Sequence, residues 1–158
     1  MPIRFHSPCV FVRDMELART FYEEAMGQTP TLVLDGYVVY PGFALWRADT
    51  AGQHVFGDAL ALPPGRLGRD NFELYFETGD VEAAFEAVSA RAEALCPLTT
   101  QPWGQRCFRV RDPEGHIVEV AEPMEAVARR LAASGMDVAA VCAATQMPEA
   151  FVRAALAT

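Results

Sequence analysis

Residues 7–22, SPCVFVRDMELARTFY, decide the fold because their apolar pattern returns 64 residues further along the chain, in residues 71–86, NFELYFETGDVEAAFE. In each stretch apolar side chains first occupy alternate positions and then recur with helical spacing, which predicts a strand followed by an amphipathic helix. The register is kept from one copy to the other, so that Phe21 matches Phe85. An internal repeat of this kind predicts two copies of one small module.

Short β-prone runs follow each helix and complete the two modules. The first copy is expected to hold a strand at 6–14, a helix ending before Gly27, and strands at 31–34, 37–40 and 43–47. The second is expected to hold a helix whose apolar face runs from Val81 to Leu95, and strands at 96–100, 106–111 and 116–121. Both copies therefore have the order βαβββ. The predicted fold class is α+β, with two modules that form a curled mixed sheet around a cavity.

The rest of the chain connects or extends the modules. Residues 51–70 are rich in glycine and proline and show no clear period, which is typical of a linker or a lid. We therefore expect a first module at 1–50, a linker at 51–70, a second module at 71–122 and a helical tail at 123–158.

The tail is predicted to form three short helices at 124–134, 137–145 and 148–157. The last two resemble a helix-turn-helix motif, which would read DNA through several Arg, Asn or Gln side chains of its second helix. That helix offers only Arg153, against Glu149, and the three arginines of the tail are balanced by three acidic residues. Packing on the body or on a partner subunit is favoured over contact with DNA.

The composition excludes several classes of function. The chain has 158 residues, 51% of them hydrophobic, and its formal net charge of -8 repels a nucleic-acid backbone. All 13 basic residues are arginine, which excludes Schiff-base lysines, lysine general bases and the lysine of a phosphate-binding loop. The four cysteines form no CxxC pair, and no apolar run reaches the roughly 18 residues of a membrane span. We expect a cytoplasmic protein with neither a membrane nor a nucleic-acid partner.

The repeat, together with the stretch from Trp103 to Glu119, resembles the vicinal-oxygen-chelate superfamily. The stretch from Trp103 to Glu119 reads WGQRCFRVRDPEGHIVE, and the resemblance covers about residues 6–122. The superfamily includes glyoxalases, extradiol dioxygenases, fosfomycin-resistance enzymes and bleomycin-binding proteins. It implies two βαβββ modules around a ligand cavity, in a homodimer.

The resemblance also implies four positions at which the metalloenzymes of the superfamily carry metal ligands. These positions hold Ser7, Asn71, either Leu45 or Trp46, and Glu119. Only Glu119 is an ordinary ligand for a divalent transition metal, which prefers imidazole and carboxylate donors. We therefore expect no cofactor. A divalent metal would require Glu119 together with His6 brought inward by a bulge, or the recruitment of His54 or Glu73.

The same resemblance predicts the residues that line the cavity. Strand alternation places Asn71, Glu73 and Tyr75 on one face of their strand. Trp46, Tyr40 and Trp103 are candidate aromatic walls, with core or dimer packing as the alternative for each. Asp112, Pro113 and Gly115 are expected to form a turn rather than to take part in chemistry, and His116 is expected at the surface or facing a dimer partner.

The functional interpretations differ in the role that they give to Glu119. Burial without a partner would raise its pKa and make it a candidate general acid or base. An arginine from the neighbouring strand, Arg106, Arg109 or Arg111, would instead make it part of a structural ion pair. A third use is to receive a cationic group of a ligand.

The sequence favours a homodimer that binds a small organic molecule, aromatic or cationic, in a metal-free cavity near Glu119. Ser7, Trp46, Asn71, Glu73, Tyr75, Trp103 and Arg106 are the candidate ligand-binding residues. Two alternatives stay open. One is a metal-dependent or acid–base lyase, isomerase or dioxygenase of the same superfamily, and the other is a regulatory or interaction module built on the tail.

Overall fold

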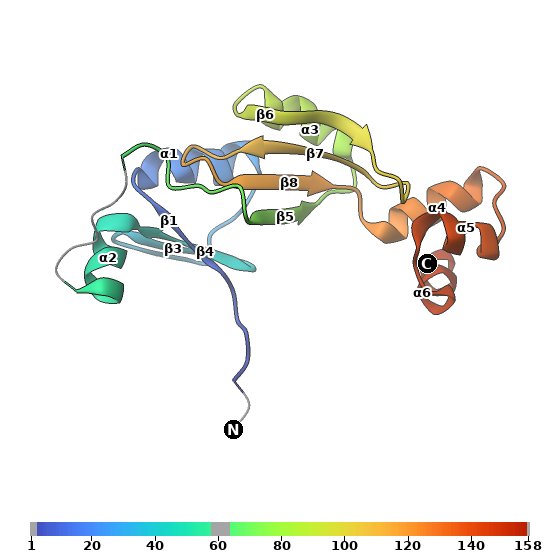
Figure 1. Cartoon of the computed structure of the whole chain (residues 1–158), viewed down its shortest axis with the longest axis horizontal. Coiled ribbons are helices and arrows are strands. Elements are labelled where there is room, and N and C mark those ends of the chain that lie inside the picture. The colour runs from blue at the N-terminus through green and yellow to red at the C-terminus, as the bar shows by residue number, and fades with distance from the viewer. Residues whose placement is uncertain (1–2, 58–63, 158) are drawn as a thin grey trace. The chain divides into compact units, whose positions relative to one another are not determined.

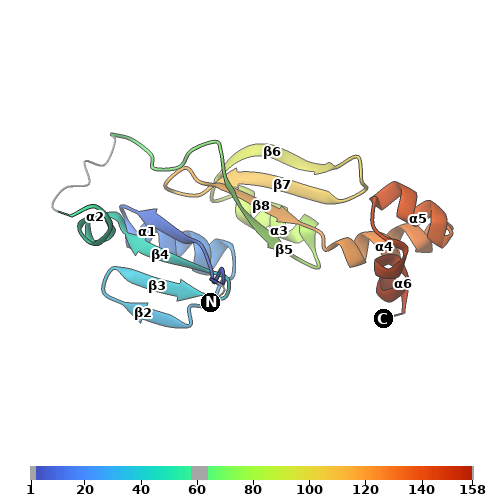
Figure 2. The same ribbon diagram turned by 60° about the horizontal axis from the view of Figure 1, so that its bottom comes forward.

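The computed structural model describes residues 3–57 and 64–157 and divides the chain into two compact units. The first unit consists of Met1–Phe72 together with Arg111–Ile117, and the second consists of Glu73–Val110 with Val118–Thr158. Each unit contains one sheet of four strands (Figures 1 and 2). The predicted α+β class, with two mixed sheets and a C-terminal helical tail, is confirmed.

The first unit is built on a sheet with the strand order β1-β4-β3-β2. Its strands are β1 (Cys9–Val12), β2 (Leu32–Leu34), β3 (Tyr37–Tyr40) and β4 (Phe43–Arg47). β1 runs parallel to β4, and the other neighbours are antiparallel. The predicted strand at 6–14 is longer than β1, whose register with β4 runs only from Cys9 to Val12; Pro8 still accepts from the Ala44 N–H at 3.0 Å but has no N–H of its own to donate.

One face of this sheet is covered by a helical segment whose two halves differ. α1 (Met15–Arg19) begins after the N-cap Asp14, and the chain then continues as the π-helix η1 (Thr20–Ala25). The predicted single helix is thus confirmed in its extent but not in its hydrogen-bonding pattern. η1 buries Phe21 and Tyr22 against the sheet, whereas Leu17 of α1 is 52% exposed.

The expected linker contains a helix that the sequence pattern did not reveal. α2 (Ala48–Phe56) follows β4 directly and buries Ala48, Ala51 and Gly52. Its buried positions are small residues, so the hydrophobic periodicity that identifies a helix is weak. Residues 58–63, also assigned to the linker or lid, lie outside the described part of the chain.

The second unit has the corresponding order β5-β8-β7-β6. Its strands are β5 (Glu73–Glu77), β6 (Glu93–Thr100), β7 (Arg106–Arg111) and β8 (Ile117–Ala121). Helix α3 (Val81–Ser89) begins at its N-cap Asp80 and covers one face, where the rings of Phe85 and Phe108 meet edge to face at 5.2 Å. The predicted helix to Leu95 is too long, because β6 already begins at Glu93 and strand pairing overrides the helical pattern.

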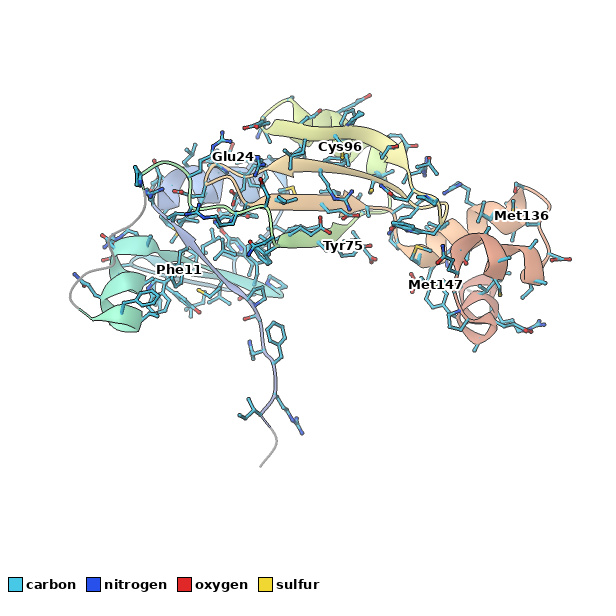
Figure 3. All side chains as sticks on the ribbon, viewed as in Figure 1. Phe11, Glu24, Tyr75, Cys96, Met136 and Met147 are labelled. Carbon is cyan, nitrogen blue, oxygen red and sulfur yellow. The ribbon has the colours of Figure 1, made fainter. Side chains whose placement is uncertain are left out.

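The tail belongs to the second unit and has a small core of its own. Its helices are α4 (Met124–Ala133), α5 (Val138–Thr145) and α6 (Glu149–Leu156), each within about one residue of the predicted bounds. They pack against one another through Ala128, Val141, Val152 and Ala155. Figure 3 labels Met136 and Met147, which lie on either side of α5 in the sequence. No helix within the described ranges is both long and apolar enough to span a membrane.

Candidate functional site

Glu119 lies on the face of the second sheet opposite to α3. The α3 side of β8 is occupied by Val118 and Val120, both buried, so alternation turns Glu119 to the other face. It is nevertheless only 4% exposed. A carboxylate in this position is largely removed from water without being part of the helix-side core.

Arg109, on the neighbouring strand β7, is the arginine that reaches Glu119. Its Nη2 donates to Glu119 Oε2, while its Nε donates to Glu73 Oε2 at 3.0 Å. One guanidinium therefore bridges two carboxylates, with one contact to each. The ion pair that the sequence left open for Glu119 is therefore present, and the other two candidates, Arg106 and Arg111, pair elsewhere, with Glu122 and Asp70.

The surroundings of Glu119 favour its protonated form. Burial raises the pKa of Glu119, the nearby Glu73 carboxyl raises it further, and the positive charge of Arg109 acts in the opposite direction. The net direction is upward. Glu119 is thus a carboxyl group that can hold a proton in conditions where an exposed glutamate has lost it.

A chain of hydrogen bonds connects the predicted aromatic residues of the second unit. Trp103 Nε1 donates to Gln105 Oε1, and Gln105 Nε2 donates to the Tyr75 hydroxyl, both at 2.9 Å. Tyr75 in turn donates to Glu77 at 2.9 Å, and burial raises the pKa of Tyr75 to about 12. Tyr75, labelled in Figure 3, is still 49% exposed and can present its ring to a ligand. Gln105, which the sequence did not single out, joins the two predicted residues.

Arg106 occupies a different environment from Glu119. It donates through its backbone N–H and its guanidinium to Glu122, and Arg130 of α4 contacts the same carboxylate. These contacts fix the start of the tail to β7 and lower the pKa of Glu122 to about 2. The structure gives Arg106 a structural set of partners and does not bring it to Glu119.

The other predicted residues lie in the first unit. Trp46 is on the face of the first sheet opposite to α1, where Phe11, Tyr37 and His54 lie around its indole at 5.6–6.0 Å. The alternative position Leu45 is fully buried on the helix side. Tyr40 is also in the helix-side core, stacked on Phe43 at 4.7 Å, so that the core-packing alternative holds for this residue.

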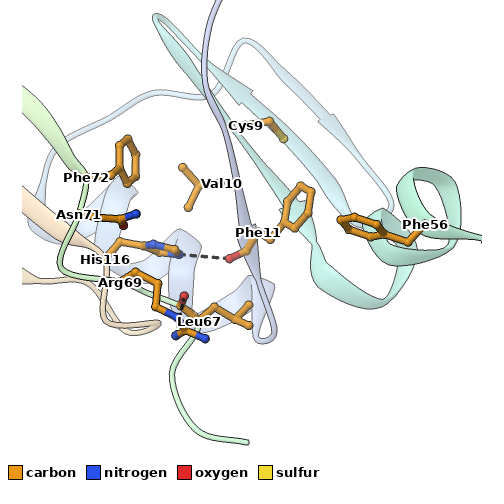
Figure 4. A pocket seen from close by; sticks show the side chains of 9 residues that line it. All are labelled: Cys9, Val10, Phe11, Phe56, Leu67, Arg69, Asn71, Phe72 and His116. Carbon is orange, nitrogen blue, oxygen red and sulfur yellow. Dashed lines mark hydrogen bonds between the residues drawn. The ribbon is translucent and has the colours of Figure 1, made fainter. Parts of the chain in front are cut away.

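Asn71 lines a pocket of about 410 Å³ within the first unit (Figure 4). Ser7 precedes β1 and lies 3.2 Å from the Nδ1 atom of His6, which is exposed. His116 lines the same pocket as Asn71 and is half-buried, with its Nε2 at 3.3 Å from the carbonyl oxygen of Phe11. His116 is therefore partly exposed, with a hydrogen bond to β1 that holds its ring, and the alternative that it faces a dimer partner stays a prediction.

The turn at 112–115 does more than reverse the chain. Asp112 is buried and accepts a hydrogen bond from the Tyr22 hydroxyl at 2.8 Å. Glu114 is buried as well and accepts from the backbone N–H of Arg13 at 2.7 Å. These partners are 90 and 101 residues away in sequence, so no local pattern could have revealed them.

The residues at the four metal positions do not fit a divalent transition metal. Ser7, Asn71 and Trp46 offer a hydroxyl, an amide and an indole, and the one carboxylate, Glu119, is already paired with Arg109. With Glu119 held by the guanidinium, these positions supply no imidazole, thiolate or free carboxylate, which are the donors that transition-metal sites use. Within residues 3–57 and 64–157 we find no group of three or more His, Cys, Asp or Glu arranged to hold a metal ion.

Comparison with known proteins agrees with this architecture. An uncharacterised protein of Mycobacterium bovis is 30% identical over 132 residues, which cover 77% of this chain and 84% of that protein. A protein of unknown function from Agrobacterium tumefaciens has 35% identity and a TM-score of 0.72, over 77% of this chain and 95% of that one. A glyoxalase/bleomycin resistance protein/dioxygenase from Nocardioides has 25% identity and a TM-score of 0.57, over 77% of this chain and 85% of that one.

The sequence profile of one family accounts for both modules. The profile of the glyoxalase-like domain matches residues 5–125, which include all eight strands of the two sheets and end at the start of α4. The match leaves most of the tail outside the family domain. This chain belongs to the glyoxalase-like domain family, within the glyoxalase, bleomycin-resistance and dioxygenase superfamily.

Proposed function

We propose that this protein binds a small organic molecule, without a metal ion, on the face of the second sheet that carries Glu119. The observation that carries the proposal is the bridged pair of carboxylates, Glu73 and Glu119, held by the single guanidinium of Arg109. Two carboxylates against one cation leave one negative charge uncompensated when both are ionised. A cationic group of a ligand, or a proton on Glu119, would compensate it.

The neighbouring side chains suit a ligand with a flat ring. Tyr75 stands beside Glu73 on the same face of β5, half-exposed and fixed by hydrogen bonds at its hydroxyl. A tyrosine ring held in this way offers a rigid surface for stacking, and an aromatic face also attracts a cation. An aromatic amine or amidine therefore matches both the charge and the shape of this surface.

The binding proposal is tested with 2-naphthylmethylamine, a cation at neutral pH, as the probe. We expect saturable binding by calorimetry, weakened at least fivefold by Glu119→Gln. The matched control is Glu86→Gln, on an exposed position of α3, which should leave the affinity unchanged. Equal affinity of the Glu119→Gln variant and the natural protein would refute the site.

The metal-free part of the proposal has its own measurement. Protein purified without chelator and analysed by inductively coupled plasma mass spectrometry is expected to hold no stoichiometric transition metal. One equivalent of zinc, nickel, manganese or iron would replace the proposal with a metal-dependent lyase, isomerase or dioxygenase of the superfamily.

Acid–base catalysis by Glu119 is the second candidate function. The raised pKa of this buried carboxyl supports it, because a general acid must hold a proton near the working pH. The hemithioacetal of methylglyoxal and glutathione is a suitable test substrate. Metal-free turnover that Glu119→Gln abolishes would support catalysis, whereas turnover that depends on added nickel or zinc would favour the metal-dependent alternative.

The third interpretation is a regulatory role for the tail. The positions of the arginines in the tail support this role less than they support packing. Arg129 donates to the carbonyl oxygen of Ala155 at 3.1 Å, and Arg130 to Glu122 and the carbonyl oxygen of Gly104. Arg153 pairs with Glu149 one helical turn away. Each arginine of the tail has an internal partner, which supports a packing role rather than recognition of nucleic acid.

A further inference from the structure

The first unit contains a pocket that the proposed function does not use. It has a volume of about 410 Å³, within the range of small-molecule sites, and lies beside β1. Phe11, Phe56 and Phe72, together with Leu67, are among its apolar lining residues. The pocket is therefore large enough, and apolar enough, for a molecule of one or two aromatic rings.

The polar groups of the pocket are gathered on one side. Figure 4 shows Asn71, His116 and Arg69 on one side of β1 together with the ring of Phe72, and the rings of Phe11 and Phe56 on the other side. An aromatic ring beside the polar groups matches a ligand with an aromatic body and a polar head.

The charge of these polar groups determines which head fits. Arg69 brings a positive charge, and its Nη1 is held by the carbonyl oxygens of residues 66–68 at 3.1–3.2 Å. Asn71 is exposed, and its amide has no hydrogen-bond partner within the described residues. No Asp or Glu is found among the described residues that line the pocket. An anionic head would meet a cation and a free amide donor, whereas a cationic head would meet no counter-charge.

The shape of the polar side is fixed by close backbone packing. Gly68 donates its N–H to the carbonyl oxygen of Glu114 at 2.9 Å, and a Cβ added at Gly68 would overlap the carbonyl group of Gly115. The ring of His116 is held by Phe11 and meets Phe72 edge to face at 6.5 Å. Such packing positions the pocket before any ligand arrives, which reduces the entropic cost of binding.

We propose that this pocket is a second binding site, specific for small aromatic carboxylates. The inference does not depend on the proposed function, because the two sites share no residue and prefer opposite charges. The acidic Glu119 site selects a cation, and the pocket beside β1 selects an anion of similar ring size.

Two probes with the same ring and opposite charge test the proposal. We expect 2-naphthoate to bind with an affinity at least fivefold reduced by Asn71→Asp, which keeps the size of the side chain and places a carboxylate in the pocket. Gln53→Glu, on the exposed surface of α2, is the control for the change in net charge and should have no such effect. Binding of 2-naphthylmethylamine should not be weakened by Asn71→Asp.

The rates at which the cysteines of the intact protein are alkylated show where the probe binds. Cys9 lines the pocket and is exposed, while Cys142 is half-buried in the tail and serves as the internal reference. Saturating 2-naphthoate should slow alkylation of Cys9 by iodoacetamide at least threefold, measured by mass spectrometry, without changing Cys142. Phe72→Ala should weaken both the binding and the protection.

Three results would overturn the proposal. These are the absence of 2-naphthoate binding at millimolar concentration, an affinity that Asn71→Asp leaves unchanged, and binding that does not protect Cys9. The Glu119→Gln variant distinguishes the two sites, because it should weaken the binding of 2-naphthylmethylamine and leave the binding of 2-naphthoate unchanged. Failure of one site thus does not imply failure of the other.

Discussion

At the scale of single residues, Glu122 shows how strongly position determines the behaviour of a carboxylate. Burial by itself would raise its pKa, yet the hydrogen bonds from Arg130 and Arg106 lower the pKa to about 2. Glu119, three residues earlier on β8, lies on the face that α3 does not cover and its pKa is raised. Two glutamates of one short segment thus differ because their partners differ.

Glu122→Gln is expected to destabilise the protein by about 2–4 kcal/mol at pH 7, because it leaves two arginines beside a buried neutral amide. Since the folded-state pKa lies below the ordinary value, the stabilisation is present above about pH 4.5 and is lost as the pH falls towards 2. Urea unfolding of both proteins at several pH values measures this. Glu125→Gln, exposed on α4, is the control, and a pH-independent difference would contradict the expectation.

Tyr22→Phe tests the buried hydrogen bond to Asp112. Removal of the hydroxyl leaves the buried Asp112 carboxyl with one partner fewer, which should cost about 1–3 kcal/mol in the free energy of unfolding. Tyr37→Phe is the matched control, because Tyr37 meets Trp46 through its ring and its hydroxyl has no hydrogen-bond partner in the described part of the chain. Equal stability of the two variants in urea would show that the hydrogen bond contributes nothing.

At the scale of elements, the turn between β7 and β8 is a packing element of the first unit. Asp112 and Glu114 bind groups of η1 and β1, and Gly68 packs directly on Gly115. The sequence identified the turn from its Asp-Pro-Glu-Gly pattern but gave no sign of its partners. Turn chemistry is local, whereas the groups that a turn contacts depend on the whole path of the chain.

Gly68→Ala is expected to destabilise the first unit by about 3 kcal/mol or more, since the added Cβ would overlap the backbone of Gly115, which cannot move independently of the turn. Gly79→Ala is the control, because a Cβ added there would meet nothing within 4 Å and the φ of Gly79 is not positive. Thermal unfolding followed by circular dichroism compares the two. A similar midpoint for both variants would show that the Gly68 contact is not tight in solution.

At the scale of the whole molecule, the resemblance to the superfamily implies a homodimer, which stays a prediction, and the first unit exposes apolar residues that a second copy would cover. All three residues of the edge strand β2 are 47–54% exposed, and Ile3 and Phe5 before β1 are more exposed still. An apolar edge strand left uncovered is a ready site for pairing with another chain. A second copy would remove these side chains from water.

Size-exclusion chromatography with light scattering is expected to give twice the 17.3 kDa of a single chain. Val33→Glu, on the exposed edge strand, should shift the distribution towards the monomer because it places a charge among apolar side chains. The exposed Gln53→Glu serves as the control. A monomer at all concentrations of the natural protein would contradict the dimer.

The sequence alone determined the number and order of the modules, because strand alternation and helical periodicity are local and occur twice. The bounds of β3, β4 and β7 were predicted to the residue, and those of the tail helices nearly so. Where local patterns conflicted with strand pairing, as at the end of α3, or were weakened by small residues, as in α2, the prediction failed.

The tertiary structure decided which groups meet. The sequence placed Glu119 on a face of its strand, but only folding brought Arg109 and Glu73 close to it. Folding also paired Arg106 with Glu122 instead of Glu119. The pocket beside β1 likewise joins residues from β1, α2, the segment before β5 and the turn at 116. The physical reason is that secondary structure follows from neighbours along the chain, whereas burial, pKa and binding surfaces follow from neighbours in space.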